Sequence, residues 1–188
     1  MNIDIKRRKE KTHIFIRRVL YLLLFFVEYV AMTTLPFSGR MPLFLLSTAI
    51  CISVFEEPFT AAMTGAVAGL MLDSAEGAII GLNSCLLIFC CMFTSLLFYF
   101  IMRKHIVNVL MLTFAAAFLQ TGVRYVFYYF IWGYDPEGKI YTHEMIPIII
   151  FTVISSAVIY PLIKFTVSRL GEIKETFVEE KSEDIVRE

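Results

Sequence analysis

The sequence has few charged residues, and this shortage indicates whether the protein is soluble or lies in a membrane. Of its 188 residues, 18% are charged and 58% are hydrophobic, and the mean hydropathy is +0.72. A typical soluble domain is nearer a quarter charged. A bilayer core about 30 Å thick requires about 20 apolar residues per helix, so the chain has room for roughly five to seven spanning helices. The composition therefore predicts an integral membrane protein and leaves little length for a soluble domain.

Residues typical of metal, redox or nucleotide sites are few and scattered. The four cysteines lie in apolar runs without paired CxxC spacing, which argues against a zinc or thiol redox centre and favours small packing residues. His13, His105 and His143 are too far apart in sequence to suggest a metal centre. The chain contains no nucleotide-binding glycine loop and no arguable Ser-His-Asp set. We therefore expect no catalytic residues, no metal, no cofactor and no nucleic-acid partner.

Six apolar stretches predict an all-α integral membrane protein, a bundle of six transmembrane helices. Turn residues or charges separate the stretches, which lie at about 19–35, 43–55, 59–72, 82–102, 106–131 and 146–168. The second and third are short for full spans, and Pro58 lies between them after Glu56 and Glu57. A tight turn at a membrane face is one interpretation of this segment, and a re-entrant hairpin is the alternative.

Lys and Arg are unevenly distributed and predict the orientation. The first 18 residues contain seven of them, and basic flanks resist translocation, so the amino terminus is expected in the cytoplasm. With six crossings, the loop at 103–105 and the carboxyl-terminal tail are also cytoplasmic. The predicted divisions are a basic segment over 1–18, a six-helix domain over 19–169 and an acidic tail over 170–188. We interpret the tail as solvated, with a docking role as the alternative.

Small residues recur at every fourth position in the third stretch and just beyond it. The recurring set is Ala61, Gly65, Gly69, Asp73 and Gly77. On one helix such positions form a stripe, and small side chains let another backbone approach closely, which favours helix association in lipid. We expect the stripe to pack inside this protein, with contact to a partner chain as the alternative. Asp73, together with Gly81 further on, predicts a carboxylate cap for the next helix.

Two ionisable residues, Glu28 and Arg124, fall within predicted spans. Each is costly to leave facing lipid, so both are expected to face protein or water. Each lies seven residues from the external end of its span, or about 10 Å deep at 1.5 Å per residue, and this equal depth permits a salt bridge. Gln120 shares a helical stripe with Arg124. We interpret these residues as structural, with a substrate or proton site as the alternative.

The segment GAVAGLMLDSAEGAIIGLN, from Gly65 to Asn83, resembles a known family. It is similar to the rod shape-determining protein MreD, which has a G-x-x-x-G-L-x-x-D segment followed by a glycine turn and G-x-N or a close variant. The positions that fall on this pattern are Gly65, Gly69, Leu70, Asp73, Gly77 and Gly81. The close match covers roughly twenty residues, and the rest of the chain agrees in hydropathy.

The resemblance implies a non-enzymatic scaffold in the bacterial cytoplasmic membrane. Its expected partners are an MreC-like single-span protein and, indirectly, the actin-like MreB and the peptidoglycan synthases. It also implies a bundle resembling the substrate-binding subunits of energy-coupling-factor vitamin transporters. That likeness supplies the alternative function, a vitamin-binding transporter subunit. The basic amino-terminal segment and the acidic tail do not map onto the family.

Overall fold

The computed structural model describes residues 2–34, 43–76, 81–127 and 146–170. Within these ranges the chain forms six helices and no strand. They are α1 (Asn2–Thr34), α2 (Phe44–Ser53), α3 (Pro58–Glu76), α4 (Leu82–Phe100), α5 (Ile106–Tyr125) and α6 (Ile146–Leu170). Three of them, α4, α5 and α6, are long and apolar enough to cross a membrane. The predicted fold class, an all-α membrane protein with six helices, is confirmed, and the likeness to vitamin-transporter subunits stays a prediction.

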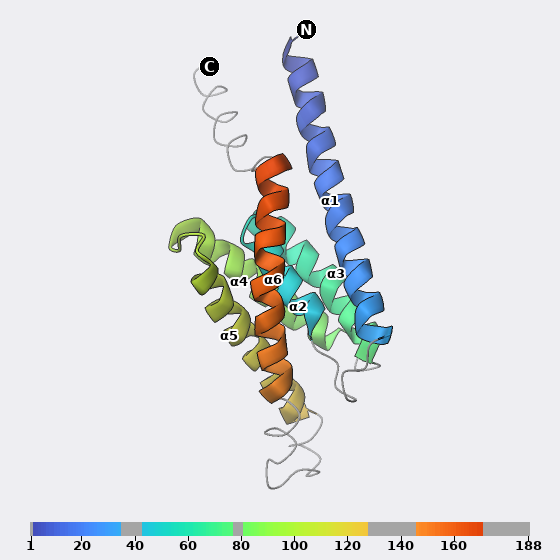
Figure 1. The fold of residues 1–188 in the computed structure, drawn as a ribbon, viewed down its shortest axis with the longest axis vertical. Coiled ribbons are helices and arrows are strands. Elements are labelled where there is room, and N and C mark those ends of the chain that lie inside the picture. The colour runs from blue at the N-terminus through green and yellow to red at the C-terminus, as the bar shows by residue number, and fades with distance from the viewer. Residues whose placement is uncertain (1, 35–42, 77–80, 128–145, 171–188) are drawn as a thin grey trace.

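The helices run back and forth between two ends of a bundle (Figure 1). The amino-terminal part of α1, the α2–α3 turn, the α4–α5 turn and the carboxyl end of α6 lie toward the top of Figure 1. We call this the Glu56 end, after a residue of the α2–α3 turn, and the opposite one the Asp73 end, after a residue near the carboxyl end of α3. Helix α1 extends beyond the bundle at the Glu56 end. It runs unbroken through residue 18, where the sequence predicts a boundary.

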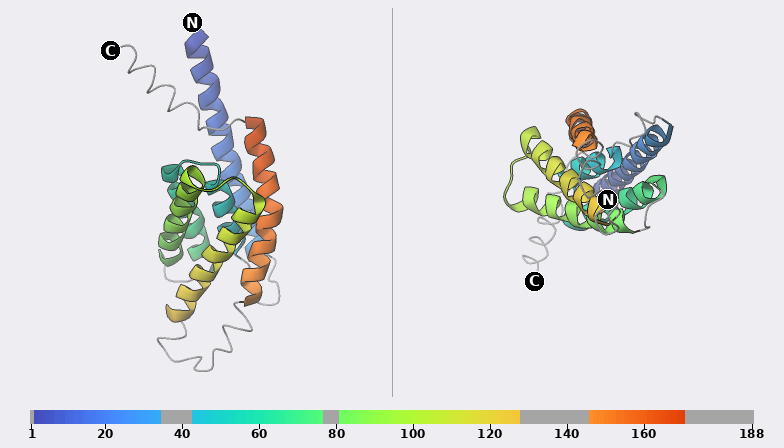
Figure 2. Two further views of the ribbon diagram at one scale, coloured as in Figure 1. Left: turned by 90° about the vertical axis from the view of Figure 1, so that its left-hand side faces the viewer. Right: turned by 90° about the horizontal axis from the view of Figure 1, so that it is seen from below.

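Helix α2 is the centre of the bundle although it is the shortest of the six described helices. All of its residues except Phe44 are buried, and it contacts each of the other five helices (Figure 2). Its ten residues extend for about 15 Å, which is half the thickness of a hydrocarbon core. Protein surrounds this short helix, so its length does not have to match the thickness of the lipid.

Local residues explain where α3 and α4 begin. Pro58 is the first residue of α3, a position where the missing N–H of proline costs nothing and its fixed φ suits the helix. Gly81 precedes α4 with φ of 101°, a left-handed conformation that is strained for residues with a Cβ atom. These two residues fix where each helix of the α3–α4 hairpin begins, and this hairpin contains the predicted stripe.

Candidate functional site

Helices α3 and α4 pack with almost no space between their backbones. A Cβ atom added at Gly65 would lie 2.6 Å from the carbonyl oxygen of Leu87, and one added at Gly69 would lie 2.7 Å from the backbone nitrogen of Ser84. Real Cβ atoms essentially never come so close. Ala61, one turn before Gly65, is also fully buried. The GxxxG segment therefore faces α4 of the same chain.

This geometry corresponds to the internal-packing interpretation of the stripe. Contact between the stripe and a partner chain stays a prediction, and Gly77 lies outside the described residues. We call the contact between α3 and α4 through Gly65 and Gly69 the α3–α4 seam.

Asp73 closes the α3–α4 seam at the Asp73 end. Its carboxylate accepts hydrogen bonds from the backbone N–H groups of Gly81, at 2.8 Å, and Asn83, at 3.2 Å, and from the Ser84 hydroxyl, at 3.1 Å. The Asp73 residue is only 1% exposed. Free N–H groups and the helix dipole both favour an anion at a helix start. The carboxylate thus occupies the capping position that the sequence indicates.

Asn83 continues this polar site from α4 to α5. Its side-chain oxygen accepts a hydrogen bond from Nε2 of Gln120 at 2.9 Å, and both side chains are buried. Among the described residues, the Gln120 oxygen and the Thr121 hydroxyl are buried without a hydrogen-bond partner. The sequence placed Gln120 on an inward stripe, but the bond to Asn83 was missed because nothing in the spacing links the two. The pairing of Arg124 with Glu28 stays a prediction.

Glu28 is buried at the contact between α1 and α2. One of its carboxylate oxygens accepts a hydrogen bond from the Thr48 hydroxyl, and the other is buried with no hydrogen-bond partner in the described part of the chain. Further along α2, the Cys51 sulfur lies 3.3 Å from the Ser156 hydroxyl of α6, which lies 3.1 Å from the Thr113 hydroxyl of α5. Polar contacts through α2 therefore join four helices.

A third buried acid, Glu56, is bound at the Glu56 end. The Arg17 guanidinium of α1 lies 2.7 Å from the Glu56 carboxylate, with side chains only 2% and 3% exposed. Ser95 of α4 donates a hydrogen bond to the Glu56 carbonyl oxygen at 2.6 Å. Burial raises the pKa of the Glu56 carboxyl, and the Arg17 guanidinium is the strongest influence that opposes this rise. Sequence reasoning missed the pair because it used Arg17 only to predict orientation and Glu56 only to predict a turn.

Aromatic and cationic side chains join the turns at the same end. The rings of Phe55 and Tyr160 stack at 5.9 Å between centroids, and the Lys104 ammonium lies 5.1 Å from the centre of the Phe55 ring. The Tyr160 hydroxyl also donates to the Lys104 carbonyl oxygen at 2.9 Å. The α2–α3 turn, the α4–α5 turn and α6 are therefore held together at the Glu56 end.

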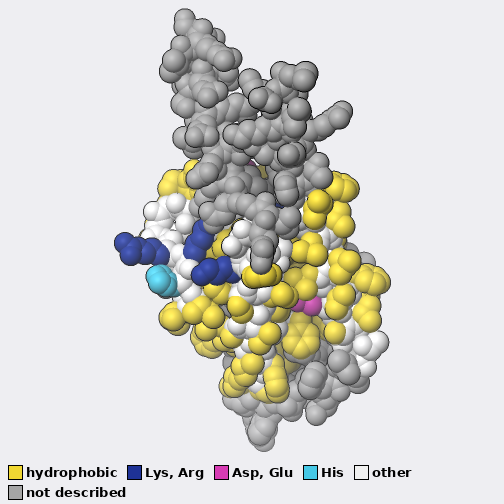
Figure 3. Space-filling model, turned by 45° about the horizontal axis from the view of Figure 1, so that its top comes forward, with side chains coloured by type: hydrophobic (Ala, Val, Ile, Leu, Met, Phe, Trp, Pro, Cys, Tyr) yellow, Lys and Arg dark blue, Asp and Glu magenta, His cyan; other side chains and the backbone are white. Residues whose placement is uncertain are grey.

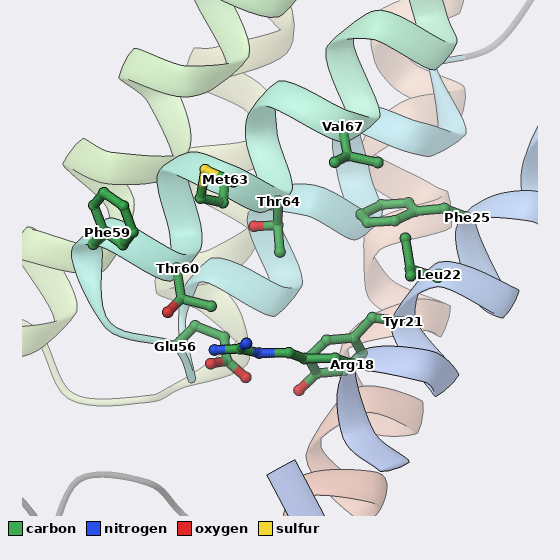
Figure 4. Close-up of a pocket in the computed structure, with 10 residues that line it drawn as sticks. All are labelled: Arg18, Tyr21, Leu22, Phe25, Glu56, Phe59, Thr60, Met63, Thr64 and Val67. Atoms are coloured by element: carbon green, nitrogen blue, oxygen red, sulfur yellow. The ribbon is translucent and has the colours of Figure 1, made fainter. Parts of the chain in front are cut away.

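A groove of about 290 Å³ opens between α1 and α3 beside the Arg17–Glu56 pair. Apolar side chains such as Leu22 and Phe25 of α1 and Met63 of α3 line it, and Arg18 lies with Glu56 at its end (Figure 4). We call it the α1–α3 groove. Within the described ranges, no group of three or more His, Cys, Asp or Glu side chains is placed to hold a metal ion.

The fold and these contacts define a helical membrane protein whose buried acids contact neighbouring helices of its own bundle. The chain belongs to the family of the rod shape-determining protein MreD, whose family model matches residues 9–168. The resemblance drawn from the segment Gly65–Asn83 is thereby confirmed, and membership implies a role in determining rod shape. No curated protein and no solved structure matches the chain.

Proposed function

We propose that this protein is a non-enzymatic scaffold of the bacterial cell-elongation machinery. It binds an MreC-like single-span protein and, through it, couples MreB and the peptidoglycan synthases to the membrane. Membership of the MreD family supports a role in cell shape. The observation that carries the scaffold proposal is the use of the buried acids: Asp73 binds the start of α4, Glu56 binds α1, and Glu28 contacts α2. Acids used in this way stabilise a rigid surface for partners.

We further infer six crossings of the membrane with both termini in the cytoplasm. The alternation of helix ends supports this topology (Figure 1). Basic residues on the described elements also support it. Arg103 and Lys104 lie on the α4–α5 turn at the Glu56 end, whereas Arg124 lies in the last turn of α5, toward the other end. The acidic α2–α3 turn fits the same orientation, because its Glu56 is neutralised by Arg17.

Affinity purification from native membranes in mild detergent tests the scaffold proposal. We expect a stoichiometric MreC-like partner, identified by mass spectrometry, and no stoichiometric water-soluble ligand such as a vitamin in the native mass spectrum. Gly69→Ala, which strains the α3–α4 seam but leaves the protein recoverable, should reduce the amount of partner that co-purifies. Gly122→Ala is the matched control, because a Cβ atom there meets nothing within 4 Å, and it should retain the partner. A stoichiometric vitamin without such a partner would instead support the transporter-subunit function.

A further inference from the structure

The α1–α3 groove differs from the rest of the apolar surface because it has a charged end. Its lining on α1 runs from Arg18 to Phe25 and its lining on α3 from Phe59 to Val67. At 1.5 Å per residue, each side is about 10–12 Å long, roughly a third of a hydrocarbon core. The groove therefore starts at the Glu56 end and stops well short of the opposite membrane face.

Two guanidinium groups lie around one carboxylate where the groove begins. Arg17 is buried against Glu56, whereas Arg18 is exposed and extends along the groove end toward the same carboxylate (Figure 4). Glu57 is also near Glu56, but it does not line the groove. A guanidinium has five N–H donors in a planar fork, so Arg18 retains donors for an anion such as a phosphate.

The surroundings of this end are basic. Figure 3 shows Lys and Arg side chains beside a histidine and among hydrophobic side chains on the face that includes the Glu56 end. The same helix α1 carries five further basic residues in its first turns, at Lys6, Arg7, Arg8, Lys9 and Lys11. Clusters of four to eight Lys and Arg residues beside a membrane helix are typical of segments that bind anionic lipid headgroups.

We propose that the α1–α3 groove binds one anionic phospholipid. Arg18 binds the headgroup phosphate at the Glu56 end, and the first part of an acyl chain lies along Leu22, Phe25 and Met63. The groove is too short for the continuous contact that a transmembrane helix of a partner would make. Its single exposed cation matches a lipid phosphate at headgroup depth. This inference stands apart from the scaffold function, and the purification above can succeed or fail independently of it.

A tryptophan placed at the groove can report which lipid lies there. The chain has one tryptophan, Trp132, so Trp132→Phe combined with Phe59→Trp gives a single reporter on the groove lining. The protein is reconstituted in vesicles that contain acyl-brominated phosphatidylglycerol or acyl-brominated phosphatidylcholine, and quenching by the two lipids is compared. Because one basic group near the surface contributes about 1 kcal/mol, we expect phosphatidylglycerol to be preferred about fivefold.

Variants of Arg18 show whether the preference comes from the groove. Arg18→Gln should reduce the ratio to about one, and Arg18→Lys should retain most of it because the positive charge is kept. Arg103→Gln is the matched control, an exposed arginine on the α4–α5 turn, and it should leave the ratio unchanged. Equal quenching by both lipids in the reporter protein that keeps Arg18 would overturn the proposal. Such a result would show only the non-selective contact that any membrane protein makes with lipid. Quenching by neither would also overturn it, because a protein segment would then cover the groove.

Discussion

The two sides of α3 show opposite ways of packing against a neighbouring helix. On the side facing α4, Gly65 and Gly69 let the backbones touch, and no volume remains for a Cβ atom. On the side facing α1, larger residues such as Phe59 and Met63 border an open groove. Each side is also bound by one acid at its end, Asp73 on the α4 side and Glu56, in the turn before α3, on the α1 side.

This difference separates the rigid part of the bundle from the part that is open to its surroundings. The α3–α4 seam combines backbone contact with a capped helix start, so it leaves no room for a ligand. The α1–α3 groove is held mainly at its Glu56 end, where a buried ion pair joins α1 to the α2–α3 turn. Substitutions on the two sides should therefore have different consequences for folding.

The largest effect is expected at Gly69. A leucine there would force its side chain into the backbone of Ser84, so Gly69→Leu should abolish recovery of monodisperse protein in detergent. Gly69→Ala should lower the free energy of unfolding by about 1–3 kcal/mol through overpacking. Size-exclusion chromatography after stepwise heating measures both variants.

Two control variants sharpen this comparison. Gly122→Ala in α5 meets nothing within 4 Å and should be neutral or stabilising by about 0.5–1 kcal/mol, because alanine favours a helix interior. Thr64→Leu, on the groove side of α3, should stay within about 0.5 kcal/mol of the wild type. If Gly69→Ala proved as stable as Gly122→Ala, the α3–α4 seam would not be as tight as its geometry indicates.

The next largest effect is expected from breaking the ion pair at the Glu56 end. Arg17→Gln leaves the Glu56 carboxylate buried without its partner, which should cost about 3–5 kcal/mol. The double variant Arg17→Gln, Glu56→Gln removes the stranded charge and should recover much of that loss. Thermal unfolding in detergent, followed by circular dichroism, measures the three proteins. A double variant no more stable than Arg17→Gln would show that the pair acts through packing and not through charge.

The stability of the single variant Arg17→Gln should also depend on pH in a characteristic way. Burial raises the pKa of Glu56 in the folded protein, and Arg17 opposes that rise. Without Arg17 the folded pKa lies further above the unfolded value, so the folded state binds the proton more tightly. Arg17→Gln should therefore be most stable below the unfolded pKa, and it should lose stability as the pH rises toward the folded pKa. An unchanged pH profile would contradict burial of Glu56 in the variant.

The sequence predicted much of the α3–α4 side because its signals are local. The four-residue spacing of Gly65 and Gly69 defines one helix face, and Asp73 lies only eight residues before Gly81. A short connection leaves few places where the carboxylate can lie, so the cap follows from the spacing. The six helices can be predicted for the same reason, because the hydropathy of each apolar stretch depends only on its own contiguous residues.

The α1 side could not be predicted in this way because its contacts join distant segments. Nothing in the spacing of Arg17 and Glu56 indicates that they meet. Neither hydropathy nor the number of charges shows which acidic residue pairs with Arg17. The bond between Asn83 and Gln120 is similar, since it depends on how α4 and α5 are placed by tertiary packing. The central place of α2 also depends on all of its neighbours. These features need the assembled bundle.

The smallest of the expected effects tests the cap at the Asp73 end. Asp73→Ala removes three hydrogen bonds at the start of α4, and loss of a helix cap costs about 0.5–2 kcal/mol. Asp73→Asn should cost less, because its amide oxygen can still accept the hydrogen bonds made to one carboxylate oxygen, although the charge and the acceptor at the other oxygen are lost. Chemical unfolding in detergent measures both against Ser74→Ala. Ser74 is the matched control because it is exposed and bonds within its own helix, to the Leu70 carbonyl. If Asp73→Ala were no less stable than Ser74→Ala, the glycine contacts alone would hold the α3–α4 side, and Asp73 would not stabilise that side as Glu56 stabilises the α1 side.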